Sequence, residues 1–270
     1  MTELDAIRSA PAPRTRESLS ADLCRLGLTA GMTVLVHSSL SSLGWVCGGA
    51  TAVVEALIDV VTAEGTIVMP THSGDLSDPA EWGNPPVPAD WWPVIRETMP
   101  AFDPRTTPKR GMGRIVEVFR TWPGVVRSMH PQLSFAAWGK HADAVTAGHG
   151  LDFALGEGSP LARIYDLDGW VLLLGVGHDN NTSFHLAEHR AGVRTETEPG
   201  APVMEAGRRV WKTFRDIAMD SDPFPDIGRA YEESTGAVRV GTVGSAECRL
   251  FRQRPAVDFA ARWLRNHAGT

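Results

Sequence analysis

The stretch GMTVLVHSSLSSLGWVCGGATAVVEALIDVVTAEGTIVM, residues 31–69, decides the class of fold. Its first apolar run, Thr33–Val36, is rich in β-branched residues and predicts a buried strand. The Gly48-Gly49 pair then opens an apolar segment with helical spacing that ends before Gly65. A second predicted strand, Thr66–Met69, follows. Strand, helix and strand in this order form a βαβ unit, which implies that the two strands are parallel.

Apolar spacing on either side of this unit predicts further elements. They are helices over 16–26, 113–120 and about 181–190, and strands near 133–138 and over 170–176. The segment 71–108 is rich in Pro, Trp and Asp, and it is too long for an ordinary connection. We therefore interpret it as either a functional lid or an insertion.

The last third of the chain has a different pattern. Glycines interrupt the apolar runs over 203–217 and 237–251, which predicts antiparallel strands, and an amphipathic helix runs to about residue 267. We therefore expect a single α/β domain over residues 1–270, with a mostly parallel central sheet and an antiparallel C-terminal annex.

Composition and charge exclude several classes of protein. The 270 residues are 43% hydrophobic and 21% charged, as in globular proteins, and the longest apolar run, Trp170–Val176, is too short to span a membrane. The formal net charge is −6, and the 26 Lys and Arg residues form no cluster, which argues against a nucleic-acid partner. Residues 1–18 hold no apolar signal sequence, and the three cysteines are scattered. We expect a cytoplasmic protein without a membrane or nucleic-acid partner.

Most common catalytic signatures are missing from the sequence. There is no Gly-x-Ser-x-Gly nucleophile elbow and no Gly-x4-Gly-Lys-Ser/Thr phosphate loop. However, His185-Leu-Ala-Glu188-His189 has the His-x-x-Glu-His order of inverted zinc peptidases, in which two histidines bind zinc and the glutamate activates water. A zinc-dependent hydrolase that uses His185, Glu188 and His189 is therefore one hypothesis.

Three polar segments follow predicted strands, which is where ligands bind in α/β sheets. They are His37–Gly44, Arg127–Phe135 and His178–Glu188. Small hydroxylated residues after the first strand can approach an extended ligand closely, and the glycines there let backbone amides face an anion. These segments supply most of the candidate binding residues.

The same segments contain motifs in which the sequence resembles the aminoglycoside 3-N-acetyltransferase family. The matching stretches occur in order: Val36–Ser39, Glu64–Thr71, Met112-Gly113 with Glu117, Phe119 and Arg120, Arg127–Pro131 with Ser134, Gly158–Pro160 with Tyr165, Leu172–Asp179, Asn181-Thr182 and His185–Glu188. Beyond residue 195 the match is limited to Asp220-x-Asp222 and Asp226–Gly228. Together these motifs are far more specific than any one alone.

The resemblance implies transfer of an acetyl group from acetyl-CoA, as cosubstrate and with no metal, to the 3-amino group of 2-deoxystreptamine aminoglycosides, which confers resistance. A neutral imidazole suits removal of the amine proton because its pKa is close to the working pH. His185 matches the family's catalytic base, and His37 is its rival. Glu188 lies one turn on, where it could orient polar groups on that helical face. Asp222, and second to it Asp220, match carboxylates that either hold the imidazole tautomer or grip the amino sugar.

A CoA site is also implied by the resemblance. The candidate residues are His37, Ser38, Ser39, Ser42, Leu43, Gly44, Thr71, Arg110, Met112, Gly113, His130 and Phe135. The serines and Gly44 are expected to contact the pantetheine arm, His130 and Phe135 to line its tunnel, and the helix start at Gly113 with Arg110 to bind phosphates. The expected partners are thus an aminoglycoside and CoA, with the protein as a monomer or a homodimer.

Overall fold

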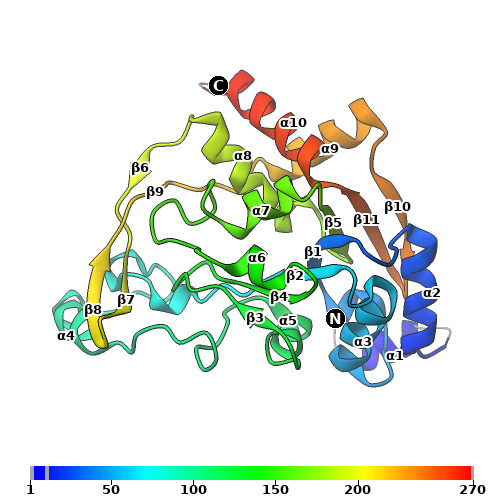
Figure 1. The fold of residues 1–270 in the computed structure, drawn as a ribbon, viewed down its shortest axis with the longest axis horizontal. Coiled ribbons are helices and arrows are strands. Elements are labelled where there is room, and N and C mark those ends of the chain that lie inside the picture. Colours follow the sequence, from blue (N-terminus) through cyan, green and yellow to red (C-terminus); the bar gives the residue numbers. More distant parts are fainter. Residues whose placement is uncertain (1–2, 10–11, 269–270) are drawn as a thin grey trace.

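A mixed sheet of seven strands forms the centre of the computed structural model, which describes residues 3–9 and 12–268 (Figure 1). Three parallel strands occupy the middle of this sheet: β5 (Trp170–Leu174), β1 (Thr33–Ser38) and β2 (Thr66–Pro70). Helix α3 (Gly49–Val61) connects β1 to β2, so the predicted βαβ unit is confirmed. Its register places Val34 beside Ile67 on one side and beside Trp170 on the other.

Antiparallel strands extend the sheet at both edges. They are β4 (Phe135–Gly139) and β3 (Val126–Arg127) beyond β2, and β11 (Ala246–Arg252) and β10 (Arg239–Val243) beyond β5. Within the described residues, five of the seven strands (β10, β5, β1, β2 and β3) run in one direction. The predicted α/β class, with a mostly parallel centre and antiparallel C-terminal strands, is confirmed. The β10–β11 hairpin of the predicted annex is part of the main sheet.

Helices bury both faces of the three parallel strands, which explains why these strands are continuously apolar. Val34 and Val36 belong to the core that includes α2 (Arg16–Leu26), α3 and α5 (Gly113–Arg120). Leu35 belongs to the opposite core. That face is covered by α6 (Ala142–Thr146), α7 (Pro160–Asp166), α8 (Ser183–Ala191), α9 (Phe224–Thr235) and α10 (Gln253–Asn266).

The sequence pattern did not predict helix α9. Its first turn contains Pro225, and Gly228 in its interior lowers helix propensity. The structure explains Gly228, because a Cβ atom there would collide with the ring of His178. A residue that weakens the local helix signal is thus required by tertiary packing.

The segment over 71–108 is ordered and packs against a separate hairpin. It contains α4 (Trp92–Thr98) and three short 3-10 turns, Gly74–Leu76, Pro79–Glu81 and Ala89–Trp91. The hairpin consists of β7 (Gly200–Glu205) and β8 (Arg208–Thr213), and β6 (Glu196–Thr197) pairs with β9 (Asp216–Ile217) nearby in the chain. Arg209 Nε donates to the Met99 carbonyl at 2.9 Å, and Figure 1 shows α4, β7 and β8 together at one end of the molecule.

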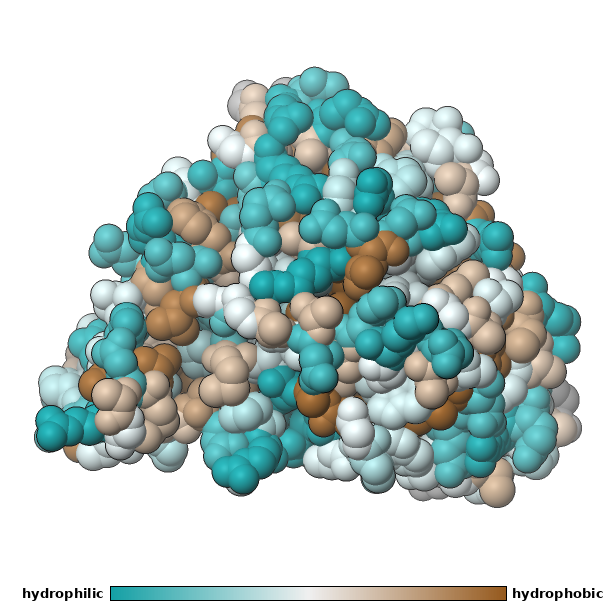
Figure 2. Space-filling view, viewed as in Figure 1, coloured by the Kyte–Doolittle hydropathy of each residue, from teal (hydrophilic) through white to brown (hydrophobic). Residues whose placement is uncertain are grey.

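Polar residues cover most of the face shown in Figure 2, and hydrophobic residues form small separate groups on it. None of the helices in residues 3–9 and 12–268 has the length and apolar character needed to cross a membrane.

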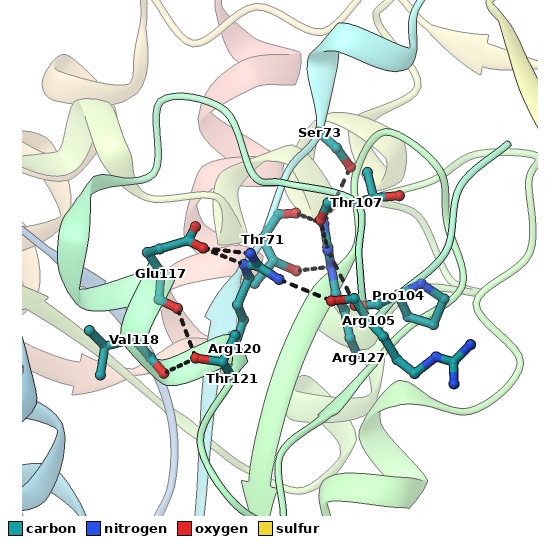
Figure 3. Close-up of polar contacts among 10 residues, drawn as sticks. All are labelled: Thr71, Ser73, Pro104, Arg105, Thr107, Glu117, Val118, Arg120, Thr121 and Arg127. Atoms are coloured by element: carbon teal, nitrogen blue, oxygen red, sulfur yellow. Dashed lines mark hydrogen bonds and ion pairs between the residues drawn. The ribbon is translucent and has the colours of Figure 1, made fainter. Parts of the chain in front are cut away.

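A buried arginine, Arg127, connects the end of β2 to the segment over 71–108 (Figure 3). Its Nη2 donates to the Thr71 carbonyl at 2.6 Å, and its Nη1 donates to the Thr107 carbonyl at 2.6 Å. Its Nε contacts the hydroxyls of Ser134 at 2.9 Å and Thr71 at 3.1 Å. No carboxylate of the described residues pairs with this guanidinium, and burial lowers the pKa of Arg127 to about 10, with Arg120 adding to the effect. Arg127 therefore fixes the backbone at Thr71, directly before His72, and at Thr107 near the other end of the segment.

We expect Arg127→Met to destabilise the fold by about 2 kcal/mol, because it leaves the Thr107 carbonyl without its donor and the Thr71 carbonyl with only the Ser134 hydroxyl, and a buried polar group left unsatisfied costs roughly 1–3 kcal/mol. For a chain of this size this loss lowers Tm by about 4–8 °C, which calorimetry can measure. The exposed neighbour Arg105 supplies the control, since Arg105→Met removes only a surface pair with Asp103 and should change stability by less than about 0.5 kcal/mol. Equal Tm values for the two variants would contradict the role given to Arg127.

Candidate active site

A cavity of about 1220 Å³ opens at the carboxyl ends of the parallel strands, as expected for ligand sites in open α/β sheets. Its wall combines residues that are far apart in the sequence. They include Ala6 of α1 (Glu3–Ser9), His37, Ser38, Ser39 and Gly44 after β1, His72 after β2, Met112, Gly113 and Arg114 at the start of α5, and Asp179, Asn180, Thr182 and His185 after β5. Two of the three polar segments singled out in the sequence, His37–Gly44 and His178–Glu188, thus contribute residues to this wall, and Arg127–Phe135 does not.

His185 and Glu188 form a hydrogen-bonded pair on one face of α8. The distance from His185 Nδ1 to Glu188 Oε2 is 2.6 Å. A carboxylate only accepts hydrogen bonds, so Nδ1 carries the proton and Nε2 is the basic nitrogen of the neutral ring. The ring edge of His185 also packs on Phe224, with 4.8 Å between the ring centroids. This pair gives the cavity wall an imidazole of defined tautomer, the candidate general base.

Glu188 is itself fully buried and receives further donors from the chain beyond α8. Arg194 Nε donates to its Oε1 at 2.6 Å, and the backbone N–H of Asp220 donates to the same oxygen at 3.1 Å. A buried carboxylate is stable in its ionised form only when it is paired and hydrogen-bonded. These contacts therefore satisfy the buried carboxylate of Glu188 and hold it beside His185.

Asp222 does not hold the imidazole tautomer; Glu188 does. The Asp222 side chain is exposed, and its backbone N–H donates to Asp220 Oδ1 at 2.9 Å. The Asp220 carboxylate contacts Arg194, with 3.3 Å between Oδ2 and Nη2. Orientation of His185, one of the two roles expected for these aspartates, therefore belongs to Glu188, whose carboxylate already occupies Nδ1, and the other expected role, contact with the amino sugar, stays a prediction. Ser221, between the two aspartates in the sequence, lines the cavity.

Two further histidines, His37 and His72, line the same cavity. Burial, with a smaller contribution from His185, lowers the pKa of each to about 3. Both rings are therefore neutral at physiological pH, and their low basicity makes them poor proton acceptors. This electrostatic difference favours His185 over His37 as the base.

The cavity wall also offers a site for an elongated anionic ligand. Ser38, Ser39 and Gly44 lie along it, and the N-termini of α3 and α5 open onto it at Gly49 and Gly113. Unpaired N–H groups at a helix N-terminus favour anions such as phosphates. Of the candidate CoA-binding residues, the cavity contains His37, Ser38, Ser39, Gly44, Met112 and Gly113.

The other six candidates do not line the cavity in the part of the chain that the structure describes. They are Ser42, Leu43, Thr71, Arg110, His130 and Phe135. Ser42 donates its hydroxyl to Ser39 at 2.9 Å, and Leu43 is fully buried in the apolar core. The Arg110 side chain forms a surface ion pair with Asp75. These three residues support or flank the wall instead of forming it.

Thr71, His130 and Phe135 lie behind the wall. Thr71 is buried against Arg127, and Phe135 in β4 packs edge-on against the ring of His72, with centroids 5.5 Å apart. His130 Nδ1 accepts backbone N–H groups from residues 132 and 133, so its Nε2 donates to the Leu151 carbonyl at 3.2 Å. The expected tunnel-lining role of His130 and Phe135 is therefore wrong for this geometry, because both side chains are used in packing.

The described residues do not assemble a zinc site around the His-x-x-Glu-His motif. Glu188 is bound to His185 and Arg194, so it is not available to activate a metal-bound water. His189 lies apart, with its ring edge-on to Phe153 and its Nε2 3.6 Å from Asp216. No group of three or more His, Cys, Asp or Glu side chains among residues 3–9 and 12–268 is arranged to hold a metal ion.

Sequence reasoning missed three polar residues of this region. His72 lines the cavity, Asp179 adds an exposed carboxylate to its wall, and Arg194 fixes Glu188. His72 and Asp179 each follow a central strand, and this position was the available signal. Arg194 lies six residues beyond Glu188, past the end of α8, so no helical spacing indicates their contact.

Comparison with known proteins agrees with this geometry. Residues 35–265 match the family described as Aminoglycoside 3-N-acetyltransferase. The chain is 54% identical over 262 residues to the SPbeta prophage-derived aminoglycoside N(3')-acetyltransferase-like protein YokD of Bacillus subtilis (strain 168), covering 97% of this chain and 96% of that protein. The crystal structure of YokD superposes with a TM-score of 0.96 at 53% identity, covering 98% of both chains.

Two more distant relatives carry enzyme names. Aminoglycoside N(3)-acetyltransferase IX of Micromonospora chalcea is 36% identical, covering 98% of both chains. A structure described as AAC-IIIb binary with CoASH superposes with a TM-score of 0.82 at 31% identity, covering 96% of this chain and 99% of that one. The chain therefore belongs to the aminoglycoside 3-N-acetyltransferase family, a family of acyltransferases.

Proposed function

We propose that this protein transfers the acetyl group of acetyl-CoA to the 3-amino group of a 2-deoxystreptamine aminoglycoside and thereby confers resistance. The observation that carries the proposal is the His185–Glu188 pair in the wall of a cavity that also contains Ser38, Ser39 and the N-terminus of α5. A base and an anion-binding wall in one cavity are what this reaction requires. The AAC-IIIb relative, whose structure contains CoASH, supports acetyl-CoA as the donor.

In the proposed reaction, His185 Nε2 accepts the proton of the attacking amine while the nitrogen bonds to the thioester carbonyl carbon. The ring becomes an imidazolium, which Glu188 stabilises through the 2.6 Å hydrogen bond to Nδ1. Collapse of the tetrahedral intermediate breaks the C–S bond, and the CoA thiolate recovers the proton from His185. Arg194 holds the Glu188 carboxylate in place and acts as a positioning residue.

We assign the cosubstrate and the antibiotic to different parts of the cavity. The pantetheine arm of CoA lies along Ser38, Ser39 and Gly44, and its phosphates lie at the N-termini of α3 and α5. The ammonium groups of the aminoglycoside face the exposed carboxylates of Asp179, in the cavity wall, and of Asp222, which follows the cavity-lining Ser221 in the sequence. Asp220 contributes less, because its carboxylate is paired with Arg194.

We further propose that residues 1–270 act as one domain in the cytoplasm, where acetyl-CoA is available, as a monomer or a homodimer. The ends of this predicted domain, residues 1–2 and 269–270, lie outside the described residues, as do residues 10–11.

Mass spectrometry tests the reaction directly. Incubation with acetyl-CoA should add one acetyl group to gentamicin-, kanamycin- or apramycin-type substrates, with release of free CoA thiol. His185→Ala should reduce turnover roughly 10²–10⁴-fold, the usual contribution of a general base, while CoA binding by calorimetry persists. His189→Ala is the matched control on the same helix and should retain most activity. Absence of acetylation across the panel would refute the acceptor, and equal damage from both variants would refute the assignment of the base.

Removal of the Asp222 charge tests how the antibiotic is held. We expect Asp222→Asn to lower kcat/KM for the aminoglycoside at least tenfold, about 1.4 kcal/mol, through a higher KM, because the ammonium loses its counter-charge. Asp220→Asn should cost less in KM. The effect of Asp222→Asn on KM should become smaller as salt is added, because the Debye screening length falls to about 8 Å at physiological ionic strength. Wild-type kinetics in Asp222→Asn would contradict the proposed contact.

Buried neutral histidines set an acid limit on the fold. Burial lowers the pKa to about 3 for His37, His72 and His130, and to about 4 for His149 and His189. Because an unfolded histidine titrates near 6.5, the unfolded chain binds more protons below that pH, and the free energy of unfolding falls as pH falls. Each fully buried histidine then contributes about 2 kcal/mol of destabilisation at pH 5.

Thermal unfolding between pH 7.5 and pH 5 measures this effect. We expect Tm to be nearly constant above pH 6.5 and to fall steeply below it. His72→Gln should flatten the fall, and His267→Gln, at an exposed position, should leave it unchanged. A Tm that does not change down to pH 5 would show that these histidines are not held neutral.

A further inference from the structure

His37 occupies a rigid position in the cavity wall. It is the penultimate residue of β1, which lies between β2 and β5 in the centre of the sheet. Residues two apart in a strand point to the same face, and Leu35 belongs to the apolar core that includes α8. The imidazole of His37 is therefore held on the face of the sheet that α8, with His185, covers.

The Nε2 atom of His37 lacks a hydrogen-bond partner among the described residues. The residue is only 5% exposed, and no described residue offers a hydrogen bond to its buried Nε2. An unpaired polar atom in a buried site destabilises the fold, so natural structures rarely keep one without a function or a ligand. The bound substrate is the remaining source of a partner, because His37 lines the cavity.

His37 is neutral, so it can donate a hydrogen bond but is a poor acceptor of a proton. Burial, with a smaller contribution from His185, lowers the pKa of His37 to about 3. A neutral imidazole carries one N–H, and it can donate this hydrogen bond to a carbonyl oxygen without giving up the proton. A cationic ring at this position would instead repel both the substrate ammonium and the imidazolium formed on His185.

Acetyl transfer needs a second group besides the base. As the amine attacks, the carbonyl oxygen of the thioester gains negative charge, and a donor fixed in advance at that point stabilises the transition state. Resting on the proposed function, we infer that His37 is a second catalytic residue, whose imidazole N–H donates a hydrogen bond to the carbonyl oxygen of acetyl-CoA. His185 and His37, on α8 and β1, then flank the same carbonyl group.

The two histidines have different roles in the proposed reaction. The amine nitrogen bonds to the carbonyl carbon, its proton passes to His185, and the carbonyl π electrons move to the oxygen that His37 contacts. When the C=O bond re-forms, the C–S bond breaks and the CoA thiolate takes the proton from His185. His37 keeps its own proton throughout.

Kinetics of His37→Leu and His37→Gln test this inference. His37→Leu removes the donor with a side chain of similar size, and we expect kcat to fall roughly 10²–10³-fold, as for the loss of one oxyanion donor. KM for acetyl-CoA and the Kd of CoA should change little. His37→Gln restores an amide N–H and should recover at least about tenfold of the lost kcat, which corresponds to about 1.4 kcal/mol. His189→Leu is the matched comparison, since its Nε2 is likewise buried without a hydrogen-bond partner in the described residues but the residue does not line the cavity, and its loss of kcat should be much smaller.

Stability separates a catalytic role from a structural one. Because Nε2 of His37 has no described protein partner to lose, His37→Leu should keep or raise Tm while activity falls. A fall in Tm that parallels the fall in kcat for both His37 variants would overturn the inference.

Infrared spectroscopy tests the hydrogen bond without any antibiotic. Acetyl-CoA labelled with ¹³C at the thioester carbonyl should show a lower stretching frequency when bound to the wild type than when free. The frequency should return toward the free value in His37→Leu and remain low in His189→Leu. An unchanged frequency in His37→Leu would overturn the inference. Failure of the wild type to acetylate any aminoglycoside would instead refute the proposed acceptor, because the infrared shift depends only on bound acetyl-CoA.

Discussion

The buried carboxylate of Glu188 is the constraint on which the site depends. It is fully buried, and it receives hydrogen bonds from His185, from Arg194 and from the backbone of Asp220. An unpaired carboxylate at this depth would be strongly destabilising, so the chain beyond α8 must return to supply donors. The same folding-back places Ser221 and Phe224 in the cavity wall. The orientation of His185 and the packing of the segment after α8 thus both depend on the Glu188 carboxylate.

Arg127 is a buried cation, and its charge is compensated in a different way from that of Glu188. Its guanidinium is bound by the carbonyls of Thr71 and Thr107 and by neighbouring hydroxyls, with no carboxylate among the described residues (Figure 3). Because neutral acceptors compensate a buried charge only partly, the pKa of Arg127 falls to about 10. The five planar donors of an arginine nevertheless tie several loops to one point. On this side of the cavity, the arginine network fixes the segment that carries His72.

The candidate site could be predicted in part. The three-residue spacing of His185 and Glu188 places them on one helical face in any α-helix, and His37, Ser38 and Ser39 follow a recognisable strand, so their place at the cavity was accessible to pattern analysis. Of the two roles expected for Asp222, orientation of His185 is taken by Glu188, which occupies Nδ1, and contact with the amino sugar stays a prediction. The expectation that His130 lines the pantetheine tunnel was wrong, because both of its ring nitrogens form hydrogen bonds with backbone groups. A polar residue in a motif can have a structural or a catalytic role, and only its hydrogen-bond partners in the folded chain distinguish these roles.

By itself, the sequence determined the elements whose signals are local. The apolar runs of β1, β2 and β5, the glycine that ends α2 and the periodicity of α3 and α5 depend on residues a few positions apart, so the α/β class and the βαβ unit follow from them. The tertiary structure alone decided the contacts between distant segments. The pairing of β11 with β5, the helix α9 with Gly228 against His178, and the contact of Arg194 with Glu188 all depend on burial and on the satisfaction of buried polar groups. These are properties of the packed chain, and no short stretch of sequence encodes them.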